Sequence, residues 1–204
     1  MLNRHLQIGA LGVDFQLAGV QSIDLERLQE GVCSYSQKKC AFAYEAAVFC
    51  LQTMGHESGV ICHIDGILEE ARTVAIVWSN EIRNDVSASW DDEYEMVEEG
   101  ATAIALALID KFTDYDHVRR AGRGRGVDFY MGYAGSIKNK AGFRVFSARL
   151  EVSGILAAGS AYVVKQRVKR KKNQTRKSDI DNNPAHVIVA EFSEPMVDWS
   201  KRTP

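Results

Sequence analysis

GVDFYMGY (126–133) and FRVFSARLEVSGIL (143–156) are two runs rich in β-branched and aromatic residues, separated by the turn-like segment AGSIKNKAG (134–142). This composition predicts two consecutive β-strands. The first run contains Asp128 and the second contains Glu151. Neighbouring strands lie only about 5 Å apart, so pairing in a suitable register would bring the two carboxylates together.

The segments on either side of these strands predict two helices, a loop and a further strand. Residues 90–112 are the most secure helix, because apolar residues recur there every three or four positions. The segment RRAGRGRG (119–126) predicts an exposed loop. Residues 157–173 predict a helix, and HVIVAEF (186–192) predicts the last strand. The core-facing stripe of the first helix consists of Val97, Ala101, Ile104, Leu108 and Phe112.

The N-terminal third predicts helices followed by the start of the sheet. Asp24 precedes LERLQE as the capping residue of a short helix, and residues 39–54 form a second helix. Residues 58–64 and 72–78 are β-rich runs. They predict a pair of strands joined by a short connection.

The composition is that of one globular domain. Hydrophobic residues make up 46% of the chain and charged residues 25%, close to the averages of globular proteins. A length of 204 residues is enough for one large core. We therefore expect a single α/β domain over 1–204 with a mixed sheet. In it, 1–73 would supply the N-terminal helices and the first strands, 74–195 the core and 196–204 a tail.

Apolar runs do not indicate export or membrane insertion. No span of about twenty apolar residues occurs, and Gln7, Asp14 and Gln16 interrupt the run that a signal sequence would need. A cytoplasmic location is therefore expected. The four cysteines lack the short spacing of zinc sites, so we expect free thiols in the core. They are Cys33, Cys40, Cys50 and Cys62.

Charge is strongly separated along the chain. Between His117 and Lys177, sixteen Lys or Arg residues accompany only two acids, Asp128 and Glu151, which is a formal charge of +14. The rest of the chain has nine basic and 25 acidic residues, or −16. A concentrated basic field is typical of a protein that binds a polyanion, with nucleic acid the leading candidate. Alternatively, the two halves neutralise each other across the folded surface or across a homodimer.

The two isolated acids are explained either by charge pairing or by a metal site. Mg²⁺, or Mn²⁺ in its place, takes oxygen ligands, often one or two carboxylates with waters and phosphates. Such an ion can activate water against a phosphodiester. Glu98 is the candidate third acid, because at about 100° per residue it falls at the edge of the helical apolar stripe. Glu99 points away from the stripe, as a solvated acid would.

Several blocks of the sequence resemble the PD-(D/E)XK, restriction-endonuclease-like superfamily, and more closely a group of uncharacterised bacterial proteins. The resemblance covers about residues 74–195. It implies a restriction-endonuclease-like core, a magnesium-dependent nuclease, and Asp128 and Glu151 as metal ligands. The blocks are EEGA (98–101), GRGVDFYMG (124–132), ARLEVSG (148–154), RVKRKKNQ (167–174) and PAHVIVAEF (184–192).

The sequence departs from the superfamily at the lysine expected two residues after the second acid, because Ser153 stands there. Some members take this lysine from the next helix. In that helix Lys171 is the candidate to position water and Lys165 is the second choice; alternatively, Lys171 only extends into solvent. Lys171 continues the expected inward stripe of Ala157, Ala161, Val164 and Val168.

Basic residues of the loop and of the third helix are candidate nucleic-acid contacts. The glycine-rich loop either grips a phosphate backbone or is only a flexible connection. The candidates are Arg119, Arg120, Arg123, Arg125, Lys165, Lys169, Arg170 and Lys172.

Three functions remain open at this point. The first is a magnesium-dependent nuclease for DNA or RNA, with Asp128, Glu151, Glu98 and Lys171 as catalytic residues. The second is a nucleic-acid-binding module that keeps the fold without turnover. The third is a protein-interaction module, such as an immunity or assembly factor, whose charged halves meet a protein partner.

Overall fold

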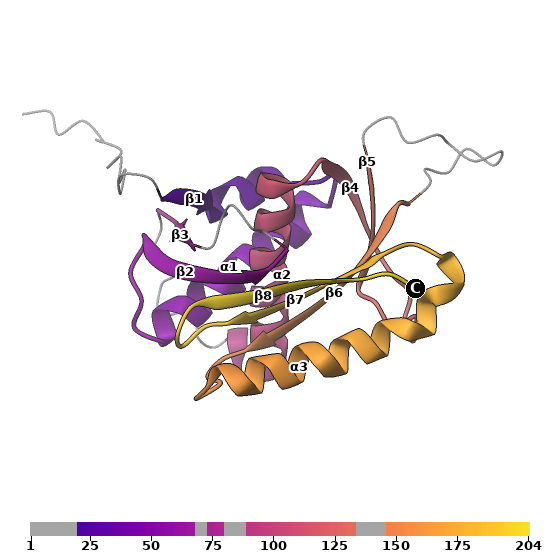
Figure 1. The fold of residues 1–204 in the computed structure, drawn as a ribbon. Helices are drawn as coiled ribbons and strands as arrows, with labels where there is room; N and C mark the ends of the chain where they lie inside the picture. The colour runs from indigo at the N-terminus through magenta and orange to yellow at the C-terminus, as the bar shows by residue number, and fades with distance from the viewer. Residues whose placement is uncertain (1–19, 68–72, 80–88, 134–145) are drawn as a thin grey trace, which may run out of the picture.

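One continuous mixed sheet organises the chain. The computed structural model describes residues 20–67, 73–79, 89–133 and 146–204, and within them eight strands follow the order β1-β3-β2-β8-β7-β6-β5-β4 (Figure 1). The pairs β1/β3, β2/β8 and β6/β7 run parallel, and the other neighbours run antiparallel. The strands are β1 (Gln21–Asp24), β2 (Val60–Gly66), β3 (Thr73–Val77), β4 (Tyr115–Arg120), β5 (Phe129–Tyr133), β6 (Ala148–Ile155), β7 (Ala185–Glu191) and β8 (Met196–Arg202).

Helices cover both faces of this sheet, which confirms the mixed α/β class. α1 and α2 pack against each other on one face, and α3 lies along the other (Figure 1). Side chains alternate along β7, so Ile188 and Ala190 join the core beneath α1 and α2, whereas Val187 and Val189 meet α3. No helix in the described ranges is long and apolar enough to cross a membrane. The helices are α1 (Gln37–Thr53), α2 (Glu93–Phe112), α3 (Ala161–Gln174) and the 3₁₀ helices η1 (Leu25–Glu30) and η3 (Thr175–Asp181).

The predicted helices and the first strand pair are present, with small shifts at their ends. α2 begins after Asp92, whose side chain accepts hydrogen bonds from the backbone N–H groups of Tyr94 and Glu95. Asp24 caps η1 in the same way. β2 and β3 form the expected antiparallel pair. Most of the connection between them and the predicted turn at 134–142 lie outside the described residues.

Two strands depart from the sequence prediction. Arg119 and Arg120 were expected in a loop but end β4, an edge strand paired with β5. Residues 196–204 were expected to be a tail but contain β8, which lies between β2 and β7. An edge strand needs few apolar residues, and β8 buries fully only Val197 and Trp199 among polar neighbours. Neither strand therefore carries a strong apolar signal.

α2 is enclosed on nearly every side, in contrast to the one-sided helix expected. All its residues from Gly100 to Ile109 are buried. On one side Gly100 lies against Cys50 of α1, and on the other the backbone of Val97 lies directly over Gly154 of β6. The missing side chain at Gly154 therefore lets α2 approach β6 closely.

Substitution of Gly154 by alanine should destabilise the protein strongly. A Cβ atom at this position would lie 2.2 Å from the carbonyl oxygen of Val97, so the backbone of α2 has to move. Overpacking costs about 1–3 kcal/mol and occasionally more, and we expect a loss of about 3 kcal/mol in the free energy of unfolding by urea. Gly122→Ala is the control, because a Cβ there meets nothing within 4 Å. Equal stabilities of the two variants would contradict the close packing of α2 on β6.

The four cysteines are free and buried, as expected. Burial raises the pKa of the Cys33, Cys50 and Cys62 thiols to about 12. A thiol is a nucleophile and a metal ligand only as the thiolate. These residues are therefore protonated packing groups of the core.

His186 is also a structural residue. Its Nδ1 accepts a hydrogen bond of 3.0 Å from the indole N–H of Trp199, and no described group hydrogen-bonds to its buried Nε2. Burial, assisted by Lys201, lowers the pKa of His186 from 6.5 to about 4. The folded protein therefore holds this ring in the neutral form.

Acid should destabilise the protein through His186. In the unfolded chain His186 is protonated below about pH 6.5, whereas in the folded protein it stays neutral until about pH 4. The free energy of unfolding therefore falls as the pH drops through this interval. The loss attributable to one such group is up to about 3 kcal/mol. Urea unfolding between pH 7 and pH 4 should show a shallower acid slope for His186→Gln than for the wild type. The exposed His63 provides the control, His63→Gln, and parallel curves for wild type and His186→Gln would contradict this account.

Candidate functional site

The candidate site lies where β5 and β6 part. β5 pairs with β6 only from Phe129 opposite Leu150 to Met131 opposite Ala148. Among the described residues, the C-terminal half of β6, from Glu151 to Ile155, therefore has no strand paired to it on the β5 side. The sequence predicted Asp128 within the strand, but in the structure it lies just before β5. Its backbone N–H donates to the carbonyl oxygen of Leu150, and its Oδ2 accepts from the backbone N–H of Val152 at 2.9 Å. The Asp128 carboxylate thus stands at the open edge of β6.

Glu151 is a buried carboxyl group next to Asp128. Its side chain is 1% exposed, and its Oε1 accepts hydrogen bonds from Lys171 Nζ at 2.7 Å and from Gln174 Nε2 at 2.8 Å. Burial, and then the charge of Asp128, raise the pKa of Glu151 to about 8 despite the nearby lysine. The Asp128 carboxylate binds the backbone N–H of Val152, the residue after Glu151, so the two acids occupy neighbouring positions along β6.

Glu98 reaches the same place from α2. Its Oε1 accepts a hydrogen bond from the Ser153 hydroxyl at 3.2 Å. Burial raises the pKa of Glu98, Asp128 adds to this rise, and Lys171 opposes it. The close approach of α2 to Gly154 explains how a residue from the opposite face of the sheet reaches the open edge of β6.

Glu99 differs from its predicted environment, whereas Glu98 lies toward Ser153 of β6. The Glu99 side chain is only 19% exposed and forms an ion pair of 3.6 Å with Arg120. Glu99 is thus not a freely solvated acid. Arg120 on β4 approaches α2 from the neighbouring edge of the sheet, a contact between distant segments that helical periodicity does not reveal.

Lys171 points inward from α3, as its stripe indicated. Val164 and Val168 are buried on the same side of the helix, although Ala161, at its start, is exposed. The Lys171 side chain is 12% exposed. Burial alone lowers the pKa of Lys171, but Glu151, Glu98 and Asp128 outweigh it and raise the pKa, so the amine is charged. Lys165, the second choice, is exposed.

Arg167 is a site residue that the sequence reasoning missed. Its Nη1 donates to the Ser153 hydroxyl at 2.8 Å and to the Gly154 carbonyl oxygen at 3.1 Å. Its charge also lowers the pKa of Glu98. A cation from α3 therefore contacts the serine that stands where the superfamily pattern has lysine. The signal was the spacing of four residues between Arg167 and Lys171, which places both on one side of a helix.

The carboxylates fit a divalent cation only in part. In the parts of the chain that the structure describes, no group of three or more His, Cys, Asp or Glu side chains is arranged to hold a metal ion. However, the Oε2 atom of Glu151 is buried without a hydrogen-bond partner among the described residues. A buried oxygen without a partner, next to the carboxylate of Asp128, suits Mg²⁺ or Mn²⁺ bound by two carboxylates and completed by other oxygen ligands.

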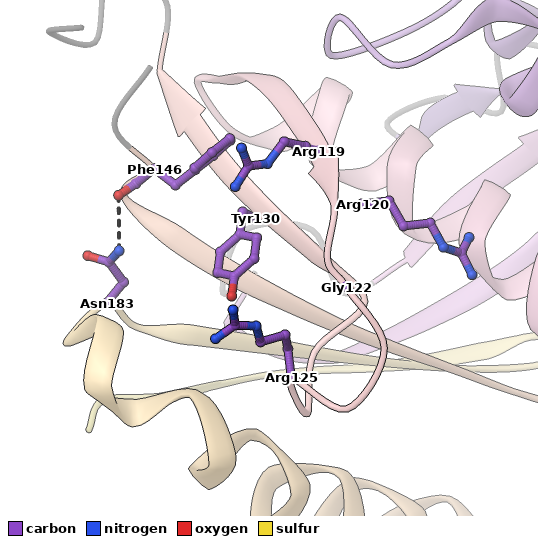
Figure 2. A pocket seen from close by; sticks show the side chains of 7 residues that line it. All are labelled: Arg119, Arg120, Gly122, Arg125, Tyr130, Phe146 and Asn183. Atoms are coloured by element: carbon purple, nitrogen blue, oxygen red, sulfur yellow. Dashed lines mark hydrogen bonds between the residues drawn. The ribbon is translucent and has the colours of Figure 1, made fainter. Parts of the chain in front are cut away.

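The predicted basic residues before β5 surround two adjoining cavities. The larger, of about 540 Å³, is lined by Arg119, Arg125 and Tyr130 among others (Figure 2). The smaller, of about 260 Å³, is lined by Arg123 and Asp128. Both are also lined by Arg120 and Gly122. These adjoining cavities connect the arginines to Asp128.

The predicted basic residues of α3 lie on a different surface. Lys165, Lys169 and Lys172 line a cavity of about 430 Å³ between α3 and β8, together with Asp198. Arg170 is exposed. Among the described residues of the basic segment, these cavities lie on two surfaces, and the first adjoins Asp128.

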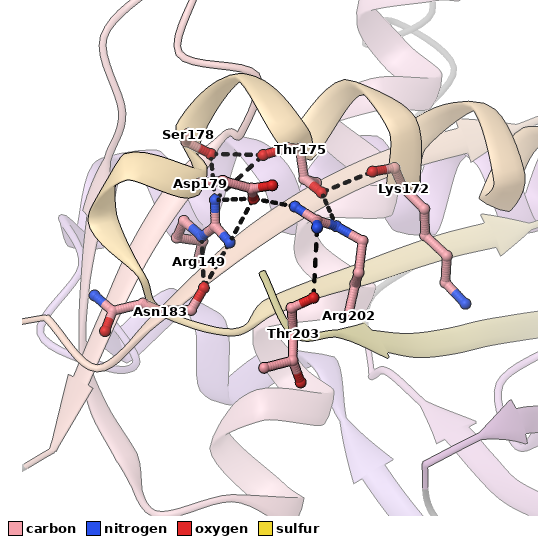
Figure 3. Close-up of polar contacts among 8 residues, drawn as sticks. All are labelled: Arg149, Lys172, Thr175, Ser178, Asp179, Asn183, Arg202 and Thr203. Carbon is pink, nitrogen blue, oxygen red and sulfur yellow. Dashed lines mark hydrogen bonds and ion pairs between the residues drawn. The ribbon is translucent and has the colours of Figure 1, made fainter.

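Arg149 belongs to the basic segment by sequence but does not contribute to its surface. It is fully buried, and its guanidinium donates to Ser178, Asp179 and the carbonyl oxygen of Asn183 (Figure 3). Asp179 also pairs with Arg202 of β8. This cluster fastens the chain after α3 to the sheet and so fixes α3 above Glu151.

Comparisons of the chain with protein-family models, with curated proteins and with solved structures find no match.

Proposed function

We propose that the protein hydrolyses phosphodiester bonds in nucleic acid with the help of Mg²⁺ or Mn²⁺, on a restriction-endonuclease-like core. The observation that carries this proposal is the convergence of Asp128, Glu151, Glu98 and Lys171 at the open edge of β6. These residues come from the position just before β5, from β6, from α2 and from α3. Convergence of three acids and one lysine from four elements is typical of a site for chemistry.

Each residue has a role that follows from its position. Asp128 and Glu151 would hold the ion, which supplies charge stabilisation and an activated water. Lys171 lies 2.7 Å from Glu151 and can orient a water against the scissile phosphate. Ser153 and Arg167 hold Glu98 in place, and the arginine adds positive charge where the phosphate would lie. The nearby arginines would bind the phosphate backbone.

A nucleic-acid-binding module without turnover is the second candidate function. One observation favours it: the Lys171 ammonium already occupies Glu151 Oε1 through a direct hydrogen bond. If this pair persists in the presence of divalent ions, the site holds no metal and the protein only binds. The two candidates therefore differ in whether the carboxylates take up a cation.

Calorimetric titration with Mg²⁺ and Mn²⁺, together with cleavage assays on DNA and RNA, tests the proposal. The wild type should bind one of these ions and cut a nucleic acid, and a chelator should stop the cutting. Nucleic-acid binding without metal binding would support the second candidate. Absence of both kinds of binding would overturn the two functions together and favour a protein-interaction role.

A further inference from the structure

The larger cavity beside the candidate site has the composition of a pocket for a nucleobase. It contains two aromatic rings, Tyr130 of β5 and Phe146 just before β6, whose centroids lie 5.6 Å apart at an angle of 41°. Arg119 lies over both rings, with its guanidinium carbon 4.5 Å from the Phe146 centroid. Unpaired bases stack on such aromatic and guanidinium planes. We call this cavity the aromatic-arginine pocket; Arg119, Arg125, Tyr130, Phe146 and Asn183 are among the residues that line it.

The charge of this pocket favours an anionic ligand. None of the described residues that line it is acidic. Arg119 and Arg125 approach Tyr130 from opposite ends, with Arg125 beside the hydroxyl end of the ring, whereas Arg120 points away (Figure 2). A nucleotide placed between them would meet a stacking surface and a guanidinium for its phosphate.

Asn183 fixes one wall of the pocket. Its side-chain amide donates to the Phe146 carbonyl oxygen at 3.0 Å, and its own carbonyl oxygen accepts from the buried Arg149. The position of Phe146 is therefore tied to the Arg149 cluster in the core. Phe146 is therefore held in position before a ligand binds, which reduces the entropy that binding would cost.

The pocket adjoins the cavity that contains Asp128. Arg120 and Gly122 line both the aromatic-arginine pocket and the smaller cavity that contains Asp128. The volume of the pocket, about 540 Å³, lies in the range of small-ligand sites. It therefore suits one nucleotide, while the adjoining strand would follow the 121–126 loop toward Asp128.

From this arrangement we infer that the aromatic-arginine pocket holds one unstacked nucleotide of a single-stranded segment next to the phosphate that is cut. This assignment rests on the proposed function, because the function supplies the hydrolysis of the neighbouring phosphodiester. The substrate class it names is nucleic acid with an unpaired stretch or end. A fully paired duplex has no base available for the pocket.

Fluorescence of 2-aminopurine in an oligonucleotide tests the inference, because stacking on an aromatic ring quenches it. Binding is measured in the presence of a chelator, so it does not depend on cleavage. The wild type should bind and quench a single-stranded oligonucleotide more strongly than the matched duplex. Tyr130→Leu should weaken single-strand binding about tenfold or more and abolish the quenching. Tyr162→Leu is the control, because Tyr162 is a 69% exposed tyrosine on α3.

The outcomes separate this inference from the proposed function. If Tyr130→Leu binds and quenches as the wild type does while metal-dependent cleavage persists, the pocket assignment is wrong and the function stands. If quenching depends on Tyr130 but no metal-dependent cleavage is found, nucleotide binding in the pocket is supported and the proposed nuclease function is contradicted. Tight binding of duplex without any quenching would also overturn the pocket.

A measurement on the wild type alone covers the case in which Tyr130→Leu does not fold. Adenosine monophosphate and inorganic phosphate are compared as competitors of the single-stranded oligonucleotide. The nucleotide should compete at a concentration at least about tenfold lower, because only the nucleotide can stack. Equal competition would mean that the arginines bind an anion without a base, which overturns the inference.

Discussion

Asp128→Asn should abolish metal-dependent cleavage while leaving the fold intact. Asparagine keeps the shape of the side chain and an oxygen that accepts the Val152 N–H bond, but it removes the charge that a divalent cation requires. We expect Mg²⁺ or Mn²⁺ binding to fall below detection in calorimetry. Cleavage should fall by about a thousandfold or more, because a catalytic metal contributes several kcal/mol to transition-state stabilisation.

Asp65→Asn is the matched control for this variant. Asp65 is an exposed acid on β2, so its replacement changes the net charge equally without touching the site. The thermal midpoints of both variants should lie close to that of the wild type. Cleavage by Asp128→Asn at the wild-type rate would remove the basis of the proposed function.

Lys171→Met should separate binding of the metal from turnover. Methionine provides no ammonium group for Glu151, so Glu151 Oε1 keeps, among the described residues, only the hydrogen bond from Gln174 and becomes more accessible to a cation. We expect metal affinity in calorimetry to stay within about tenfold of the wild type, in line with the size of effects from residues that only orient ligands. Single-turnover cleavage should fall by about a hundredfold or more, because the residue that orients the water is lost.

The neighbouring residue supplies the control, Lys172→Met. Lys172 lines the cavity between α3 and β8 and does not belong to the candidate site. Its replacement should change the salt dependence of nucleic-acid binding slightly and leave the single-turnover rate unchanged. Equal losses of rate in the two variants would mean that Lys171 acts only through the general positive charge of α3.

The candidate residues were accessible to sequence reasoning because local periodicity decides which side of an element a residue occupies. Glu98 at the edge of a helical stripe and Lys171 in line with Val168 both follow from the 3.6-residue repeat. Asp128 and Glu151 stood out because they are the only acids in a strongly basic segment. Glu99 shows the limit of this reasoning, because its environment depends on Arg120 from another strand.

Other features depend on contacts that no local pattern contains. β8 is polar enough to be mistaken for a tail, yet it lies in the sheet because β2 and β7 provide partners on both sides. Arg149 looks like one more surface arginine in the sequence, but it is buried because Asp179, Ser178 and Asn183 satisfy its guanidinium. In both cases distant segments supply the hydrogen bonds that make the position favourable.

The residue order alone therefore indicated a mixed α/β chain, its charge separation and the candidate site residues, because composition and periodicity are local properties. Three-dimensional packing was needed to bring Asp128, Glu151, Glu98 and Lys171 to one edge of β6, to place Arg167 on Ser153 and to form the aromatic-arginine pocket. The register of β5 on β6 and the approach of α2 over Gly154 decide these contacts. Both depend on the burial of the whole core and not on any single segment.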